Sequence, residues 1–148
     1  MKRFIIKSIV VAGMLFSSIT MAANFPTQEP MGGEPFGHSV KNIGDGIYVF
    51  RWWVYRNIFV VTDEGVIVTD PLNPKAAGLL LGEIRKITDK PVKYVIYSHN
   101  HHDHISGGTV FKDEGATFIA HKNVLSELAD HPSPVTPLPD ITFEDAYT

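Results

Sequence analysis

The chain has 148 residues, of which 44% are hydrophobic and 20% charged, a balance that is ordinary for a single globular domain. It contains no cysteine, which excludes disulfides, thiolate metal ligands and lipid attachment to cysteine. The net charge is −3, and the first 22 residues hold three basic side chains and no acidic one. The remainder is more acidic still, which argues against nucleic acid as a partner.

The N-terminal region predicts a signal peptide over 1–23. Basic residues up to Lys7 precede an apolar run over 8–19, and Ala22 and Ala23 supply small residues for cleavage. The run is too short to span a bilayer, and an uncleaved anchor is the alternative. We expect a secreted or periplasmic protein with no stable membrane insertion after signal removal. A flexible proline- and glycine-rich arm should follow over 24–39, and a domain over 40–148.

Short apolar runs between glycine-containing turns predict antiparallel hairpins at the start of this domain. Strands are expected over 40–43, 47–53, 57–62 and 66–70, with turns at 44–46 and 63–65. Trp52, Trp53 and Tyr55 suit either sheet packing or a substrate mouth. We favour packing for at least one tryptophan, because neighbours on a strand point to opposite faces.

A strand–helix–strand unit follows. Asn73, with proline after it, predicts the start of an amphipathic helix that ends near Thr88. The apolar run 92–97 predicts a strand buried on both faces. The right-handed crossover would place Asp70 and His99 together at the carboxyl edge of the sheet. Farther on we expect a helical turn at 109–113, a strand at 117–120, a helix at 121–130 and a strand beginning at 141–143.

Four of the seven histidines lie within six positions, together with one aspartate. On an extended segment, His99 and His101 would face the same side, and Asp103 and His104 would follow a bend. Imidazole and carboxylate ligands suit Zn²⁺, and Fe or Mn are compatible. The spacing favours two half-shells, each completed by distant residues. A histidine-rich loop that scavenges metal without specificity is the alternative.

The pattern His99-x-His101-x-Asp103-His104, after a strand and before two glycines, resembles the signature of the metallo-β-lactamase superfamily. The resemblance covers about 46–120. It implies an α/β (α+β layered) fold, namely the N-terminal part of an αββα sandwich that is incomplete at the C-terminus. It also implies a metal-dependent hydrolase with a dinuclear zinc site in the complete enzyme.

The resemblance further implies a role for each residue. His99 and His101 would bind the first metal ion, and Asp103 and His104 the second. Asp103 would also be the catalytic residue that orients the attacking water. Asp70 would support the metal loop by hydrogen bonding.

The family's remaining ligands belong to a second half of the fold, and His121 and His131 do not stand in matching contexts. His102, between ligand positions, should support the site from outside the metal shell or face solvent. We therefore expect the chain to be an N-terminal half.

Several functions remain open at this stage. Two metal ions about 3.5–4 Å apart activate water and polarise a carbonyl, phosphoryl or sulfuryl oxygen. The leading hypothesis is an exported zinc hydrolase acting on a small molecule: an ester, lactone, lactam, thioester, phosphodiester or sulfate ester. Within it, a β-lactamase is the runner-up. The alternative is a non-catalytic periplasmic metal-binding or interaction module, or an inactive fragment. The substrate and the oligomeric state stay open.

Overall fold

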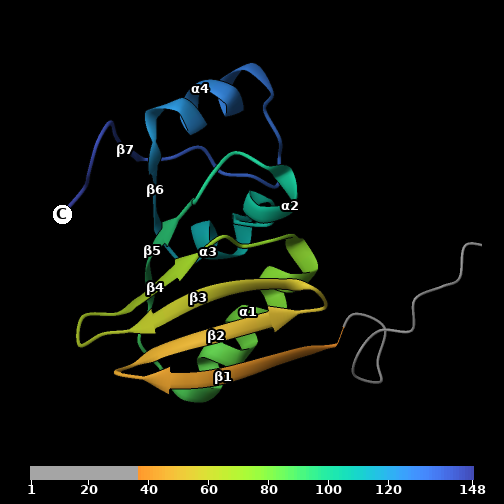
Figure 1. Ribbon diagram of the computed structural model, residues 1–148, viewed down its shortest axis with the longest axis vertical. Coiled ribbons are helices and arrows are strands. Elements are labelled where there is room, and N and C mark those ends of the chain that lie inside the picture. The colour runs from red at the N-terminus through yellow and green to blue at the C-terminus, as the bar shows by residue number, and fades with distance from the viewer. Residues whose placement is uncertain (1–36) are drawn as a thin grey trace, which may run out of the picture.

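The computed structural model describes residues 37–148 (Figure 1). The predicted signal peptide and most of the predicted arm lie outside the described residues. The first strand begins at His38, two residues before the expected domain boundary. Within residues 37–148, no helix has the length and apolar character needed to cross a membrane.

The described residues form one mixed sheet of seven strands, which lie side by side in chain order. The first four strands pair antiparallel, and the fourth to seventh pair parallel. The strands are β1 (His38–Gly44), β2 (Ile47–Trp52), β3 (Tyr55–Val61), β4 (Val66–Thr69), β5 (Val92–Ile96), β6 (Thr117–His121) and β7 (Ile141–Phe143). The helices are α1 (Pro74–Ile87), α2 (His102–Ile105), α3 (Thr109–Asp113) and α4 (Lys122–Asp130). Both predicted hairpins and the strand–helix–strand unit are confirmed.

Helix α1 begins and ends as its sequence predicts. The Asn73 side chain accepts a hydrogen bond from the backbone N–H of Ala76, so it caps the helix, and proline occupies the first turn. At the other end, the N–H of Thr88 donates to the Ile84 carbonyl. The apolar stripe of the helix is buried at Ala76, Ala77, Leu80 and Ile84.

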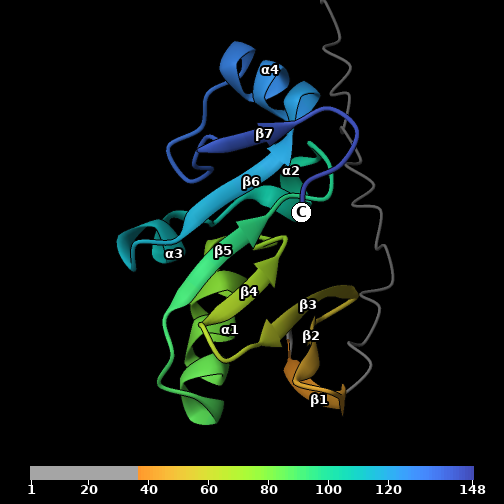
Figure 2. The same ribbon diagram turned by 90° about the vertical axis from the view of Figure 1, so that its left-hand side faces the viewer.

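Helices cover one face of the sheet and leave the other open over β4–β6 (Figure 2). Alternate side chains such as Val68 and Val95 are fully buried with the helices in one core. Their neighbours Ile67, Tyr94 and Ile96 lie on the opposite face and are partly exposed, and Ile67 pairs in register with Tyr94. The prediction that 92–97 is buried on both faces is therefore wrong, because no layer covers the second face in the described residues.

The segment after β5 turns where a bend was expected. An extended stretch was predicted for His99 and His101 with a bend before Asp103, and the bend takes the form of the short helix α2 from His102 to Ile105. Ile105 is fully buried, and the amide of Ser106 donates to the carbonyl of His102. The short helix turns His104 back toward the sheet edge and leaves Asp103 exposed in its first turn.

Candidate metal centre

Asp70 and Ser98 tie together the carboxyl ends of the two central parallel strands. The backbone amide of Asp70 donates to the Ile96 carbonyl over 3.1 Å. In return, Asp70 accepts two hydrogen bonds from Ser98, at 2.8 Å from the backbone amide and 2.6 Å from the hydroxyl. Both carboxylate oxygens are thus engaged, and the residue is only 7% exposed. The predicted juxtaposition of Asp70 with the start of the motif is confirmed.

The Ser98 hydroxyl also lies 2.7 Å from Nδ1 of His99. A serine hydroxyl carries one proton, and here it goes to the Asp70 carboxylate. Ser98 Oγ can therefore only accept from His99, which requires the proton on Nδ1. That tautomer leaves the lone pair on Nε2 free for a metal ion, the arrangement that orients histidine ligands in metal sites.

Three imidazole rings gather in front of this pair. The His99 ring centroid lies 4.6 Å from that of His101 and 4.4 Å from that of His104. One possible metal-ligating atom from each of Asp70, His99 and His104, a carboxylate oxygen or a ring nitrogen, lies within 4.8 Å of the other two. Nδ1 of His104 is 3.7 Å from an Asp70 oxygen. Clustered imidazole nitrogens and carboxylate oxygens are a donor set that suits zinc, so the residues fit such an ion.

The geometry sorts the predicted ligands into an inner and an outer pair. His99 and His104 are half-buried and belong to the close group, whereas His101 and Asp103 are exposed and do not. Asp70 joins that group, although hydrogen bonds from Ser98 already occupy both of its oxygens. This engagement favours the supporting role predicted for Asp70 over direct ligation.

Backbone contacts fix the path of the candidate metal-binding loop, residues 99–107, which is called the metal-binding loop below. The N–H of Leu72 donates to the His104 carbonyl over 2.7 Å, and Leu72 forms an isolated parallel bridge with Ile105. The N–H of Gly107 donates to the Val135 carbonyl, also over 2.7 Å. Gly107 has a φ of +86°, and a Cβ placed there would lie 2.3 Å from the backbone carbon of Asn73. Only glycine fits this position.

The strand end that carries Asp70 is under backbone strain. Asp70 and Leu72 have φ values of 36° and 72°, a region that non-glycine residues rarely adopt. The side-chain amide of buried Asn57 donates to the Asp70 carbonyl over 2.8 Å and so holds this conformation. Strain that the surroundings maintain is common at functional sites.

An aromatic pocket of about 350 Å³ adjoins the metal-binding loop. Trp52, Trp53 and Tyr55 form its wall, and Asp103 lies at its edge. The hydroxyl of Ser106, a residue only 2% exposed, lines the pocket and has no hydrogen-bond partner among the described residues. The remaining lining residues are Leu72, Asn73, Pro74, His102 and Val135. Trp52 is 8% exposed and Trp53 37%, so the prediction that at least one tryptophan packs is confirmed.

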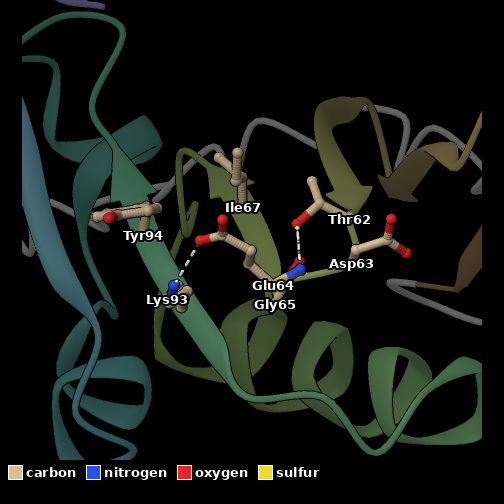
Figure 3. Close-up of a pocket in the computed structure, with 7 residues that line it drawn as sticks. All are labelled: Thr62, Asp63, Glu64, Gly65, Ile67, Lys93 and Tyr94. Atoms are coloured by element: carbon tan, nitrogen blue, oxygen red, sulfur yellow. Dashed lines mark hydrogen bonds and ion pairs between the residues drawn. The ribbon is translucent and has the colours of Figure 1, made fainter.

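Another cavity, of about 340 Å³, lies at the opposite end of the parallel strands (Figure 3). Lys93 pairs with Glu64 over 2.9 Å at its edge, and Thr62 donates to the Gly65 carbonyl. Its lining contains no histidine and no buried unpartnered polar atom. The chemistry of the described residues therefore concentrates at the carboxyl edge of the sheet.

The isolated histidines have structural partners. His121 caps α4 through the amide of Asn123, and its Nε2 lies 2.6 Å from the Glu144 carbonyl oxygen. His38 lies 3.1 Å from a Glu83 oxygen. Neither of them, nor His131, belongs to the close group of Asp70, His99 and His104 among residues 37–148.

Sequence reasoning missed three residues that shape this centre: Tyr55 as a partner of the loop, Asn57 and Ser98. Asn57 is a polar residue within an apolar strand, which is an available signal because buried amides need partners. Ser98 stands directly before His99, where a hydroxyl can reach the ring. Tyr55 offers no local signal, because it is distant in sequence from the motif.

Comparisons with known proteins give one family match and one curated relative. The sequence model of the metallo-β-lactamase superfamily matches residues 51–136. A linear primary-alkylsulfatase from a Pseudomonas species is 32% identical over 92 residues, which are 57% of this chain and 17% of that protein. The present chain thus spans under a fifth of that relative.

Solved structures share the fold. A metallo-β-lactamase from Pontibacter korlensis superposes with a TM-score of 0.65 at 21% identity, over 76% of this chain and 54% of that one. The enzyme FIM-1 from Pseudomonas aeruginosa, in its mono-zinc form, gives 0.62 at 14% identity, over 74% and 52%. Each similarity covers about half of the solved chain. The family match spans more than half of this chain and includes the histidine motif and its supporting residues, and the chain therefore belongs to the metallo-β-lactamase superfamily.

Proposed function

We propose that this chain carries the metal-binding loop of an exported zinc hydrolase. His99 and His101 would hold one ion, and Asp103 and His104 a second. The observation that carries the proposal is the convergence of three imidazoles at the carboxyl end of β5, with His99 fixed through Ser98. Export is supported by the basic and apolar pattern of the first 23 residues.

A bound zinc ion would act as a Lewis acid and lower the pKa of a water molecule toward neutrality. The chain's own groups would do the rest. The exposed Asp103 carboxylate would accept a hydrogen bond from the attacking water and set its direction. The Asp70–Ser98 pair would hold the His99 ring, and the aromatic wall would exclude solvent from one side of the substrate.

For the substrate, we favour a sulfate ester with an apolar alkyl group, hydrolysed to an alcohol and sulfate. Support comes from the similarity to a linear primary-alkylsulfatase and from the aromatic pocket beside Asp103. The pocket's size is in the range of small-molecule sites, which combine apolar walls with a few polar groups. The runner-up is a β-lactam, because solved metallo-β-lactamases share the fold.

The test is turnover by the zinc-loaded chain. Decyl sulfate, a cephalosporin, a phosphodiester and a carboxylic ester are offered in parallel, with and without chelator. Chelator-sensitive release of sulfate, and little turnover of the others, would support the proposal. Turnover of the cephalosporin alone would show that the substrate is a β-lactam and not a sulfate ester. Zinc binding with no turnover of any substrate would favour the non-catalytic metal-binding module, and absence of both would indicate an inactive fragment.

A further inference from the structure

The metal-binding loop contacts β3 through Tyr55, the first residue of that strand. The rings of Tyr55 and His104 meet edge to face, with centroids 5.9 Å apart and an angle of 82° between their planes. Tyr55 and Asp103 both line the aromatic pocket. One tyrosine therefore lies against both members of the second predicted ligand pair.

Tyr55 and the Asp103 carboxylate are neighbours in this pocket. In agreement with that placement, partial burial, the negative charge of Asp103 and a hydrogen bond to its carboxylate, in that order, raise the pKa of Tyr55. In the described part of the chain, no ion pair engages Asp103, which is exposed in the first turn of α2. Tyr55 is thus the neighbouring residue whose hydroxyl is placed to restrain this side chain.

Tyr55 is itself held in place. Its ring lies 6.2 Å from that of Trp52, roughly parallel, and 6.4 Å from that of Trp53. Trp52 and Tyr55 are paired across the β2–β3 hairpin, and Trp53 has a φ of 54° in its turn. A side chain confined by two indole rings can fix the direction of a flexible carboxylate.

We infer that Tyr55 is a positioning residue for the second metal half-shell: its hydroxyl orients Asp103 and its ring edge orients His104. The inference rests on the metal centre proposed above. The two half-shells then have separate supports. Asp70 and Ser98 act on His99 from the ends of β4 and β5, whereas Tyr55 acts on Asp103 and His104 from β3.

The test compares Tyr55→Phe, which removes only the hydroxyl, with Tyr48→Phe on β2. Tyr48 stacks on Phe59 with centroids 4.8 Å apart and lines none of the pockets described above, so it is a matched control. Stepwise zinc affinities are measured by competition with a chromophoric chelator. Imidazole signals in NMR spectra identify the histidines that each equivalent of zinc engages.

We expect Tyr55→Phe to weaken the binding step that involves His104 about tenfold, as for other residues that support metal ligands. The step reported by His99 and His101 should change less than twofold, and Tyr48→Phe should change neither. Tyr55→Leu, which also removes the ring edge, should weaken the His104 step further. Equal weakening of both steps would show a general structural effect and overturn the inference.

A measurement without metal tests the contact itself. In a double-mutant cycle of Tyr55→Phe and Asp103→Ala, the unfolding constants should show a coupling of at least about twofold. Additive effects would overturn the inference, as would a wild-type chain that binds no zinc. These readouts do not depend on turnover, so an absence of hydrolysis would refute the proposed function and leave this inference standing.

Discussion

The Asp70 carboxylate accepts hydrogen bonds from both the backbone amide and the hydroxyl of Ser98, at 2.8 and 2.6 Å. The two residues lie 28 positions apart in sequence, at the ends of neighbouring parallel strands. Because the serine proton is committed to Asp70, the hydroxyl fixes the tautomer of His99. In the proposed centre, the Asp70 carboxylate would thereby determine which nitrogen of His99 is presented to the metal ion.

Removal of the Ser98 hydroxyl should weaken zinc binding. We expect Ser98→Ala to reduce zinc affinity about tenfold, because His99 loses the acceptor that fixes its ring. Ser98→Thr keeps the hydroxyl and should restore binding, and Ser126→Ala, on the exposed side of α4, should be neutral. Competition with a chromophoric chelator measures the affinities. Unchanged zinc affinity in Ser98→Ala would show that the Ser98 hydroxyl does not orient His99 for the metal ion.

The two neighbouring histidines of the motif should behave differently. His101→Ala should abolish any turnover, because its imidazole is a predicted ligand whose ring lies against that of His99. His102→Ala should keep the zinc content within about twofold of wild type, since His102 is exposed and lies outside the close group of possible metal ligands. Initial rates and zinc content per chain check this pair. An active His101→Ala enzyme would show that the ligand assignment is wrong.

Alanine substitutions at two glycines distinguish the cost of a steric clash from the cost of a strained backbone conformation. Both Gly107 and Gly115 have φ near +87°, but a Cβ at Gly107 would meet the backbone of Asn73, whereas one at Gly115 meets nothing within 4 Å. We expect Gly107→Ala to destabilise the fold by more than about 3 kcal/mol and Gly115→Ala by about 1 kcal/mol. Urea unfolding measures both free energies. Similar values for the two variants would contradict the close approach.

Tryptophan fluorescence should show whether a ligand occupies the aromatic pocket, because the chain's only two tryptophans both line it. We expect decyl sulfate to change the tryptophan fluorescence saturably and methyl sulfate to have no effect. Val135→Glu places a charge in the pocket and should weaken decyl sulfate binding about tenfold. Leu138→Glu, at a position that is 48% exposed outside the pocket, is the control. Identical titrations for both variants would place the alkyl group elsewhere.

The stability of the described domain should depend on Asp140 in a defined pH range. Burial alone would raise the pKa of Asp140, but hydrogen bonds from Lys112 and the Phe118 amide lower it below its ordinary value of 3.8. A carboxyl group with a lowered pKa stabilises the fold above its unfolded-state pKa and loses that contribution as pH falls through the folded value.

Asp140→Asn should therefore reduce the free energy of unfolding at pH 7 by only about 0.5 kcal/mol, because solvent screens a carboxylate whose side chain is 39% exposed. The difference from wild type should shrink below about pH 4. Urea unfolding at a series of pH values measures it, with exposed Asp113→Asn as the control. A difference that stayed constant in acid would exclude the charge-dependent origin.

Local signals were enough to predict most of the fold. The turn residues between β1 and β2, the cap at Asn73 and the spacing of apolar residues in α1 each act over a few positions, and the structure confirms them. The position of Asp70 beside the motif follows from the topology of a strand–helix–strand unit. These features depend on short-range physics and on one handedness rule.

The missed features depend on contacts between distant segments. Helix α2 is stabilised where Ile105 is buried and Leu72 bonds to His104, and neither contact is visible in the local sequence. Tyr55, at the start of β3, lines the same pocket as Asp103, which is 48 positions away in sequence. The open face of β5 was misjudged because an apolar run shows that side chains can be buried but not which layer buries them.

The bonds that hold Leu72 to His104 and Gly107 to Val135 have a consequence for metal uptake. Both are hydrogen bonds between main-chain groups, so they fix the backbone conformation of the loop, and neither involves an imidazole ring. The conformational entropy of the loop is therefore lost during folding of the polypeptide, before any ion arrives. The loop backbone is thus preorganised, and an incoming ion would have to order only side chains.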